Sequence, residues 1–241
     1  MVGPVIMTSL EFIDVHAGYG PYRALNGVSV KITEGESVAI LGANGVGKST
    51  FVRVASGLVA TTSGVVTVLG RSVAGVSVHE LARRGIVHIP EGVGLFSDLS
   101  IEENLFLRIG AHRSPDNRER LSAALDMLGP LRDRRRVKAG QLSGGQQRLV
   151  AVVGAIAARP RVLLADEPAL GLSPAAADDV YGALAATKDP LTTLVIVETR
   201  LGRVESLCDR SVVLDMGTVM YDGLTTGAED VLTGLLHRTS E

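Results

Sequence analysis

One glycine-rich stretch limits the folds open to this chain more than any other part of its sequence. Residues 37–41 form an apolar run with β-branched side chains, typical of a buried strand, and a helix is favoured from Lys48 onward. The turn between them fits the pattern of glycine, four residues, glycine, lysine and serine or threonine. Its members are Gly42, Ala43, Asn44, Gly45, Val46, Gly47, Lys48, Ser49 and Thr50. Strand, turn and helix together predict a loop that holds the phosphates of a nucleoside triphosphate.

The residue types in this loop suit phosphate chemistry. Glycine tolerates positive φ, so several backbone N–H groups can point into one concavity, and the helix N-terminus adds partial positive charge beneath it. We expect Lys48 to reach the β- and γ-phosphates and the Ser49 hydroxyl to ligate Mg2+. The alternative is a glycine-rich turn that only exposes a lysine. The complete pattern and both flanking elements favour the phosphate-binding interpretation.

Composition excludes several classes of protein. A net charge of −2 gives no reason to expect nucleic-acid binding. The longest apolar run, residues 149–158, is too short to cross a bilayer, and the first nine residues lack the basic flank of a signal peptide. A single cysteine, Cys208, excludes an intramolecular disulfide and is expected to be a small buried apolar residue. We therefore expect a soluble protein of the reducing cytosol.

The apolar spacing along the chain predicts strands that alternate with helices. Strands are predicted at residues 10–15, 24–32, 37–41, 64–69, 86–89, 161–165, 193–197, 212–214 and 218–221. Helices are predicted at residues 48–56, 79–84, 101–109, 116–128, 147–158, 174–187, 201–208 and 228–238. The basic run 132–138 is interpreted as a solvated helix end or linker. Alternating strands and helices favour a mostly parallel central sheet, with antiparallel strands ahead of the phosphate loop.

Two adjacent acids follow one of the aliphatic strands. Asp166 and Glu167 come directly after residues 161–165 and before Pro168. Ligands of open α/β sheets sit at the carboxyl ends of the strands, so both acids should face the phosphate loop. Asp166 is suited to hold Mg2+ through water, and Glu167 to polarise an attacking water. The alternative is an acidic turn that only ends the strand.

A second motif, Leu142-Ser143-Gly144-Gly145-Gln146, opens the helix predicted at residues 147–158. Serine and glycines at a helix N-terminus form an anion site that needs no basic side chain. With the phosphate loop and the two acids in this order, the chain resembles the ATP-binding-cassette ATPases over about residues 9–223. The resemblance implies an α/β fold of the P-loop NTPase type, with an N-terminal antiparallel β-subdomain and an inserted α-helical subdomain. It implies one domain over 1–241: a catalytic core (9–90 and 159–223), a helical part (91–158) and a C-terminal helix (224–241).

The resemblance also implies roles for individual residues. In that family two cassettes pair head to tail, and each ATP lies between one phosphate loop and the partner's signature motif. Ser143 and Gly145, within the motif that includes Gly144 and Gln146, would contact the γ-phosphate held by the other subunit's Lys48. Tyr19 matches the aromatic side chain that stacks on adenine, Asp166 the Mg2+-binding acid and Glu167 the general base.

Three departures from the family pattern point to a branch. Glu91 stands at the lid-loop position near the metal, where most cassettes carry glutamine, and Thr199 stands where most carry a switch histidine. Ser173 replaces the usual aspartate at the end of the D-loop. These and neighbouring motifs look like the branched-chain amino-acid uptake ATPases, and the urea and short-amide importers share much of the pattern. Threonine is short and neutral, which weakens any contact of Thr199 with a γ-phosphate.

The sequence thus predicts an ATPase subunit of a membrane importer for branched-chain amino acids or a related small polar solute. The resemblance implies ATP and Mg2+, transmembrane permease subunits, a second cassette and, indirectly, an extracytoplasmic solute-binding protein, but no nucleic acid. The predicted location is cytoplasmic, peripheral on the inner face of the cell membrane. Two alternatives are a soluble cassette ATPase of a cytosolic assembly machine, and a slow, regulatory nucleotide-binding partner subunit.

Overall fold

The structure is a computed structural model that describes residues 7–92, 94–110, 115–187 and 189–238. Its strands are β1 (Thr8–Tyr19), β2 (Tyr22–Thr33), β3 (Ser37–Leu41), β4 (Thr61–Val68), β5 (Arg71–Ser72), β6 (Ile86–Ile89), β7 (Val162–Asp166), β8 (Thr193–Glu198), β9 (Arg210–Asp215) and β10 (Thr218–Leu224). Its α-helices are α1 (Lys48–Ala55), α2 (Val78–Arg83), α3 (Ile101–Gly110), α4 (Asn117–Met127), α5 (Gly144–Ala157), α6 (Pro174–Ala185) and α7 (Ala228–Arg238). Short 3-10 helices are η1 (Gly129–Arg134), η2 (Ala139–Gln141), η3 (Leu201–Arg203) and η4 (Thr225–Gly227).

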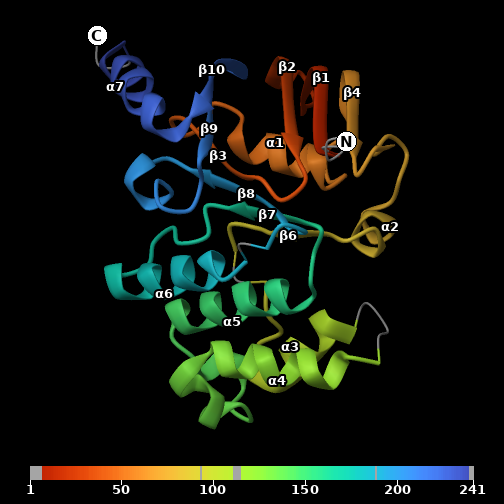
Figure 1. Ribbon diagram of the computed structural model, residues 1–241, viewed down its shortest axis with the longest axis vertical. Helices are drawn as coiled ribbons and strands as arrows, with labels where there is room; N and C mark the ends of the chain where they lie inside the picture. The colour runs from red at the N-terminus through yellow and green to blue at the C-terminus, as the bar shows by residue number, and fades with distance from the viewer. Residues whose placement is uncertain (1–6, 93, 111–114, 188, 239–241) are drawn as a thin grey trace, which may run out of the picture.

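Two sheets organise these elements. The antiparallel sheet has the order β2-β1-β4-β5, and the larger sheet has the order β10-β9-β3-β8-β7-β6. From β9 to β6 the larger sheet is parallel, and β10 pairs antiparallel with β9. Figure 1 shows the antiparallel sheet at one end, the larger sheet across the middle, α5 and α6 beneath it, and α3 and α4 at the far end. The predicted α/β class, with an antiparallel part and a mostly parallel central sheet, is confirmed.

The larger sheet divides the apolar interior into two cores. Along β7, Val162 and Leu164 join the core shared with the antiparallel sheet and α1, whereas Leu163 and Ala165 join the core shared with α3, α5 and α6. Such a strand is buried on both faces, which explains its continuous aliphatic sequence. The carboxyl ends of β3 and β7 are therefore held rigidly from both sides.

Helices occupy most of the span from 91 to 158, but they do not form a core of their own. Ile101 and Leu105 of α3 and Val150 of α5 belong to the same apolar cluster as the lower face of the larger sheet. Within the described part of the chain, no helix has both the length and the apolar character needed to span a membrane. The division into subdomains stays a prediction.

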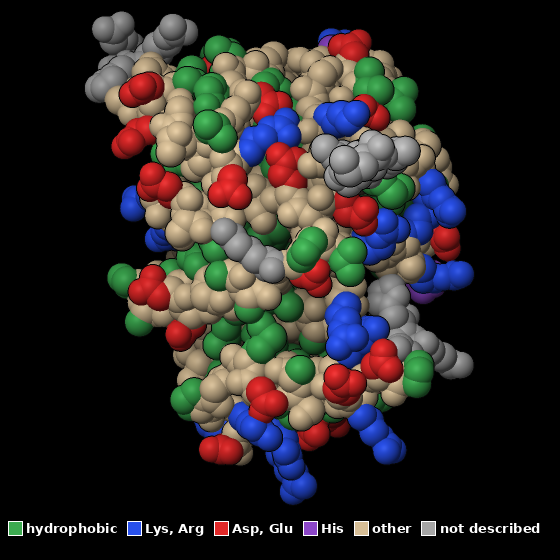
Figure 2. Space-filling view, viewed as in Figure 1, with side chains coloured by type: hydrophobic (Ala, Val, Ile, Leu, Met, Phe, Trp, Pro, Cys, Tyr) green, Lys and Arg blue, Asp and Glu red, His purple; other side chains and the backbone are tan. Residues whose placement is uncertain are grey.

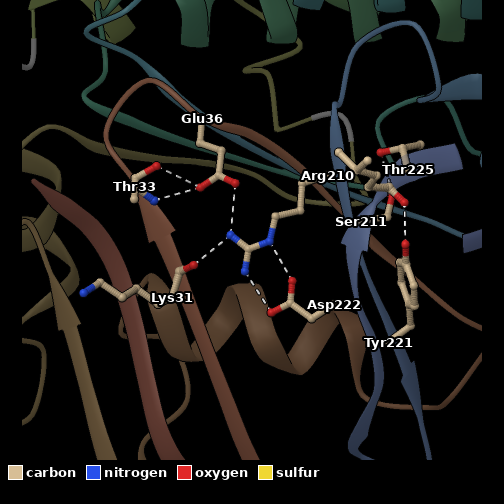
Figure 3. Close-up of polar contacts among 9 residues, drawn as sticks. Lys31, Thr33, Glu36, Arg210, Ser211, Tyr221, Asp222 and Thr225 are labelled. Carbon is tan, nitrogen blue, oxygen red and sulfur yellow. Dashed lines mark hydrogen bonds and ion pairs between the residues drawn. The ribbon is translucent and has the colours of Figure 1, made fainter. Parts of the chain in front are cut away.

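An arginine joins the two sheets at the edge opposite the phosphate loop (Figure 3). Arg210, at the start of β9, donates to both carboxylate oxygens of Asp222 on β10, at 2.6 and 2.8 Å. Its remaining terminal nitrogen donates to the Lys31 carbonyl on β2 at 2.9 Å and to Glu36 Oε1 at 3.0 Å. The paired acids raise the pKa of Arg210. One half-buried guanidinium thereby fixes β2, β9 and β10 relative to one another.

Several predicted elements differ from the observed ones by a few residues at their ends, and two differences have an identifiable cause. The helix predicted at 201–208 is only the single 3-10 turn η3, because Gly202 weakens a helix there and the chain bends to bury Val204 and Cys208. The helix predicted at 147–158 begins three residues earlier, at Gly144, because Ser143 caps it.

The basic run 132–138 follows α4 at the far end of the molecule. All five of its basic side chains are exposed, and Figure 2 shows Lys and Arg side chains projecting from that end. Arg132 forms an ion pair with Asp126, and Arg135 lies 3.8 Å from Glu102. The run is a solvated segment, as predicted.

Candidate functional site

The phosphate loop is shaped by glycines that no other residue could replace without strain. Gly42, Gly45 and Gly47 all have positive φ, and Gly47 is the N-cap of α1. A Cβ atom on Gly42 would lie 2.3 Å from the Leu214 carbonyl oxygen, and one on Gly47 would lie 2.3 Å from the Ala24 carbonyl oxygen. The loop is therefore wedged between β9 and β2. The Val46 side chain packs into the core, so Val46 can offer a ligand only its backbone.

Lys48 lies inside the curve of this loop. Its ammonium donates to the Ala43 carbonyl at 2.9 Å and lies 3.5 Å from Glu167 Oε1, and its side chain is only 4% exposed. Burial lowers the pKa of Lys48, and the Glu167 carboxylate acts against that shift. A buried cation with few partners favours an incoming phosphate, which would bring the opposite charge.

Asp166 meets Ser49 across the site. The Ser49 hydroxyl donates to Asp166 Oδ1 at 2.9 Å, and the buried Oδ2 has no hydrogen-bond partner among the described residues. Burial raises the pKa of Asp166, so the carboxyl group calls for a positive partner. Among the described residues, no three His, Cys, Asp or Glu side chains group as metal ligands. This donor set fits Mg2+, which binds one or two protein oxygens and completes its shell with phosphate and water.

Glu167 is held in an unusual backbone conformation. Its φ is 44°, in the left-handed region that a non-glycine residue rarely adopts, and its N–H donates to the Val197 carbonyl at 3.1 Å. Such strain is found where the surrounding structure imposes it, and functional sites are common examples. The turn at Glu167 brings its carboxylate to the same side as that of Asp166.

Lys48, Ser49 and Glu167 share one cavity of about 360 Å³, which Asp166 does not line. It is lined by Tyr19, Tyr22, Ala24, Asn44, Gly45, Gly47, Lys48, Ser49, Thr50, Glu91, Glu167 and Leu170. Tyr19 and Tyr22 face each other across the β1–β2 turn, and Tyr19 accepts a hydrogen bond of 3.1 Å from Arg53 on α1. Glu91 is exposed at the cavity wall. The cavity thus combines aromatic rings, a phosphate loop and acids, as a nucleotide site requires.

Other predicted residues lie elsewhere. Thr199 lines a neighbouring cavity of about 250 Å³, together with Gly42, Ala43 and Asn44, and does not line the Lys48 cavity. Its N–H donates to Glu198 Oε2 at 3.2 Å. Sequence reasoning missed Glu198, whose buried carboxylate also accepts the hydroxyl hydrogen of Tyr181. Burial raises the pKa of Glu198.

The signature motif also lies away from the cavity. Ser143 and Gln146 form a capping box in which each side chain bonds the other residue's backbone, at 3.2 and 3.3 Å. Ser143 and Gly144 are exposed, and Gly145 is half-buried. Within one chain, the structure does not bring this motif to Lys48. The exposed helix start is free to meet another molecule.

A buried arginine was also missed. Arg148 of α5 is 4% exposed and donates to carbonyl oxygens of Pro90, Gly92, Asp166, Glu167 and Pro168. The only signal in the sequence is a charged side chain within the apolar stretch 148–158. Its partners are backbone carbonyl oxygens of distant segments, and these cannot be predicted from the types of residue there.

Comparisons with known proteins agree with this geometry. The profile of the family described as ABC transporter matches residues 25–170. The high-affinity branched-chain amino acid transport ATP-binding protein BraG of Pseudomonas aeruginosa is 34% identical, over 91% of this chain and 93% of that protein. The methionine import ATP-binding protein MetN of Rhizobium johnstonii is 33% identical, over 89% of this chain and 60% of that protein. A dimeric ATP-binding cassette in a post-hydrolysis state, bound to ADP and Pi, superposes with a TM-score of 0.79 at 27% identity, over 90% of this chain and 98% of that one.

Proposed function

This chain belongs to the ABC transporter family and is an ATPase, and from that premise we propose that it drives an importer of branched-chain amino acids or a related small polar solute. The observation that carries the ATPase assignment is one cavity holding Lys48, Ser49 and Glu167, with Asp166 hydrogen-bonded to Ser49 at its edge. The importer assignment is supported by the likeness to BraG along nearly the whole of both chains.

The residues of the cavity suggest a division of labour during hydrolysis. Backbone N–H groups of the glycine loop and Lys48 bind the β- and γ-phosphates, and Tyr19 offers a ring to the adenine. Asp166 and Ser49 would hold Mg2+, which supplies charge neutralisation at the phosphates when bound. Glu167 accepts a proton from the water that attacks the γ-phosphorus, and the bond to the ADP oxygen breaks. The Glu167 carboxylate lies 3.5 Å from the Lys48 ammonium, so the base and the cation that binds the phosphates are side by side.

We propose that a second cassette completes the site. Ser143 and Gly144 lie exposed at the start of α5, beside the half-buried Gly145, and all three lie outside their own chain's cavity, as a motif serving a partner's nucleotide would. Head-to-tail pairing would close on ATP and reopen after hydrolysis. The permease subunits would sit on the Glu91 loop and the helices after it, which would place the chain at the inner face of the membrane.

The solute is open to a direct test. Co-purification with a multi-span membrane protein is expected, followed by uptake of labelled leucine by the reconstituted complex in the presence of ATP. Uptake of methionine or urea without leucine would replace the proposed solute and leave the importer assignment intact. Absence of any membrane partner would favour a cytosolic assembly ATPase.

One observation favours a second candidate, a slow regulatory partner subunit: Thr199 lies outside the Lys48 cavity. The variant Thr199→His separates the two. For a competent motor we expect the ATPase rate to change less than about threefold, because Lys48, Asp166 and Glu167 are all in place. A large gain in rate would identify a subunit whose hydrolysis is limited by its switch residue.

A further inference from the structure

We propose that Arg148 is a positioning residue that ties both the Glu91 loop and the backbone of Glu167 to helix α5. The inference rests on the ATPase function proposed above and adds a residue to it. It means that the helix carrying the signature motif and the segment carrying the base move as one unit.

The guanidinium bonds of Arg148 span two segments that are far apart in sequence. Nε donates to the Pro168 carbonyl at 2.6 Å, and Nη1 donates to the Pro90 carbonyl at 2.6 Å and to that of Gly92. Nη2 donates to the carbonyls of Asp166 and Glu167, both at 3.3 Å. One planar group therefore fixes the loop before and after Glu91 and the turn that aims Glu167.

The charge of Arg148 argues against a role in packing alone. All five acceptors are neutral carbonyls, and no carboxylate among the described residues forms an ion pair with it at contact distance. The carboxylates of Asp166 and Glu91 act on it from farther away, and burial lowers its pKa. Burying a cation without a paired anion costs desolvation free energy, and an apolar side chain of similar size would fill the same space without that cost. The five directed bonds are what an apolar side chain could not supply.

The position of Arg148 within α5 allows its hydrogen bonds to couple the start of this helix to Glu167. The helix begins at its N-cap Ser143, so Arg148 lies little more than one turn inside it, on the same rigid element as the signature glycines. A nucleotide held by a partner at Ser143 would fix α5, and Arg148 would carry that position to Glu167. The positive φ of Glu167 needs such external support.

Arg108 of α3 offers a matched control. It is a half-buried arginine of the same helical part, and its Nη2 donates to the Gly94 carbonyl at 2.8 Å. It contacts the same loop two residues beyond Gly92, and among the described residues it forms no hydrogen bond with residues 166–168. Substitution of Arg108 therefore removes one loop contact and leaves the Glu167 segment tied.

The experiment compares Arg148→Met, Arg148→Lys and Arg108→Met in the full chain, measuring kcat, ATP dissociation constant and Tm. For Arg148→Met we expect kcat to fall at least tenfold, with ATP affinity within threefold of the wild type. Arg148→Lys keeps the charge but cannot span five carbonyls, so we expect a partial loss of kcat; it also serves if the methionine variant fails to fold. Arg108→Met should leave basal kcat within twofold.

Amide hydrogen exchange gives a readout that is independent of turnover. Arg148 variants are expected to raise exchange around residues 89–92 and 166–169, and Arg108→Met only around residue 94. The proposal is overturned if Arg148→Lys keeps wild-type kcat and exchange, or if kcat, ATP affinity and Tm fall in parallel. A wild-type chain without ATPase activity would contradict the proposed function, while the exchange pattern would still decide the role of Arg148.

Discussion

Asp166 and Glu167 are neighbours whose carboxylates meet different partners. Along a regular strand their side chains would point to opposite faces of the sheet, and the Glu167 side chain would enter the core shared with α3, α5 and α6. The left-handed turn at Glu167 changes this: Asp166 bonds Ser49, while Glu167 faces Lys48. One backbone dihedral therefore directs two adjacent acids to two different partners, Ser49 and Lys48.

The variant Glu167→Gln should slow steady-state hydrolysis about 100-fold or more, because general-base catalysis contributes roughly that much. ATP should still bind, since the loop and Lys48 are unchanged and the amide keeps the side chain's size. Phosphate release and fluorescent-nucleotide binding measure the two effects, with exposed Asp178→Asn as the control. Unchanged turnover in Glu167→Gln would remove Glu167 from the role of base.

The positions of single residues were predictable where order along the chain decides them. Lys48, Ser49 and Glu167 could be found because a strand end must place its next residues at the sheet edge, and the structure brings all three to one cavity. The placement of Thr199 and the bonds of Arg148 could not be found. Each depends on packing between segments that the sequence does not mark as neighbours.

The phosphate loop depends on elements that lie beside it as much as on its own glycines. The Gly217 N–H, in the β9–β10 turn, donates to the Val46 carbonyl at 2.9 Å, and Asn26 of β2 donates to the Gly217 carbonyl at 2.8 Å. The strands predicted at 212–214 and 218–221 do pair, as the hairpin β9–β10, but the support that their turn gives to the phosphate loop was not predicted. A turn near the end of the chain thus helps to shape a site near its beginning.

Gly42→Ala should lower Tm and weaken ATP binding at least tenfold. The added methyl group would lie 2.3 Å from the Leu214 carbonyl, so the loop or β9 must shift. Gly45→Ala is the matched control: Gly45 has positive φ as well, but its Cβ would meet nothing within 4 Å. Calorimetry should show the larger drop for Gly42→Ala. Equal drops would mean that backbone strain, and not the clash, is responsible.

His88, on strand β6, should make the stability of the protein depend on pH. His88 Nδ1 lies 3.4 Å from the Ser56 hydroxyl, and its Nε2 is buried without a partner among the described residues. Burial, with Arg53 and Arg148 nearby, lowers the pKa of His88 to about 4. Between pH 6.5 and about 4 the unfolded chain binds the proton and the folded chain does not, so stability falls as pH falls through this window.

His88→Asn should flatten that pH dependence, because the uncharged amide takes up no proton in either state. The measurement is the free energy of unfolding in urea at pH 7, 6 and 5, as the difference between wild type and variant, so that other titrating groups cancel. His79→Asn, at an exposed position, should keep the wild-type slope. A slope unchanged in His88→Asn would contradict the assignment.

The strands and helices of the whole molecule follow from the apolar spacing of the sequence, but the way in which the strands pair does not. The neighbours of β3 are β8 and β9, which lie more than 150 residues later, and parallel pairing leaves no turn to set the register. The single 3-10 turn at Leu201–Arg203 was likewise hidden, since its apolar residues also suit a helix. Which segments form strands could be predicted from nearby residues, whereas the order of the strands in the sheet could not.

Two copies of the chain should associate when ATP binds. Glu167→Gln, which binds ATP and hydrolyses it slowly, is expected to double its mass by light scattering when MgATP is added. Ser143→Arg in the same background should stay monomeric, because a bulky side chain at the exposed start of α5 blocks the facing surface. Arg118→Glu, an exposed change on α4, serves as the control. A monomeric Glu167→Gln with bound ATP would exclude closure of two copies of this chain.

The separation of the signature residues from their own cavity has a kinetic consequence. If two cassettes pair head to tail as proposed, each isolated chain carries one half of each of two sites and cannot complete either site alone. In dilute solution the hydrolysis rate should therefore rise with the square of the protein concentration and become proportional to it only once pairing is saturated. A permease that held two cassettes side by side would remove this encounter step, and the hydrolysis rate per cassette would then no longer depend on dilution.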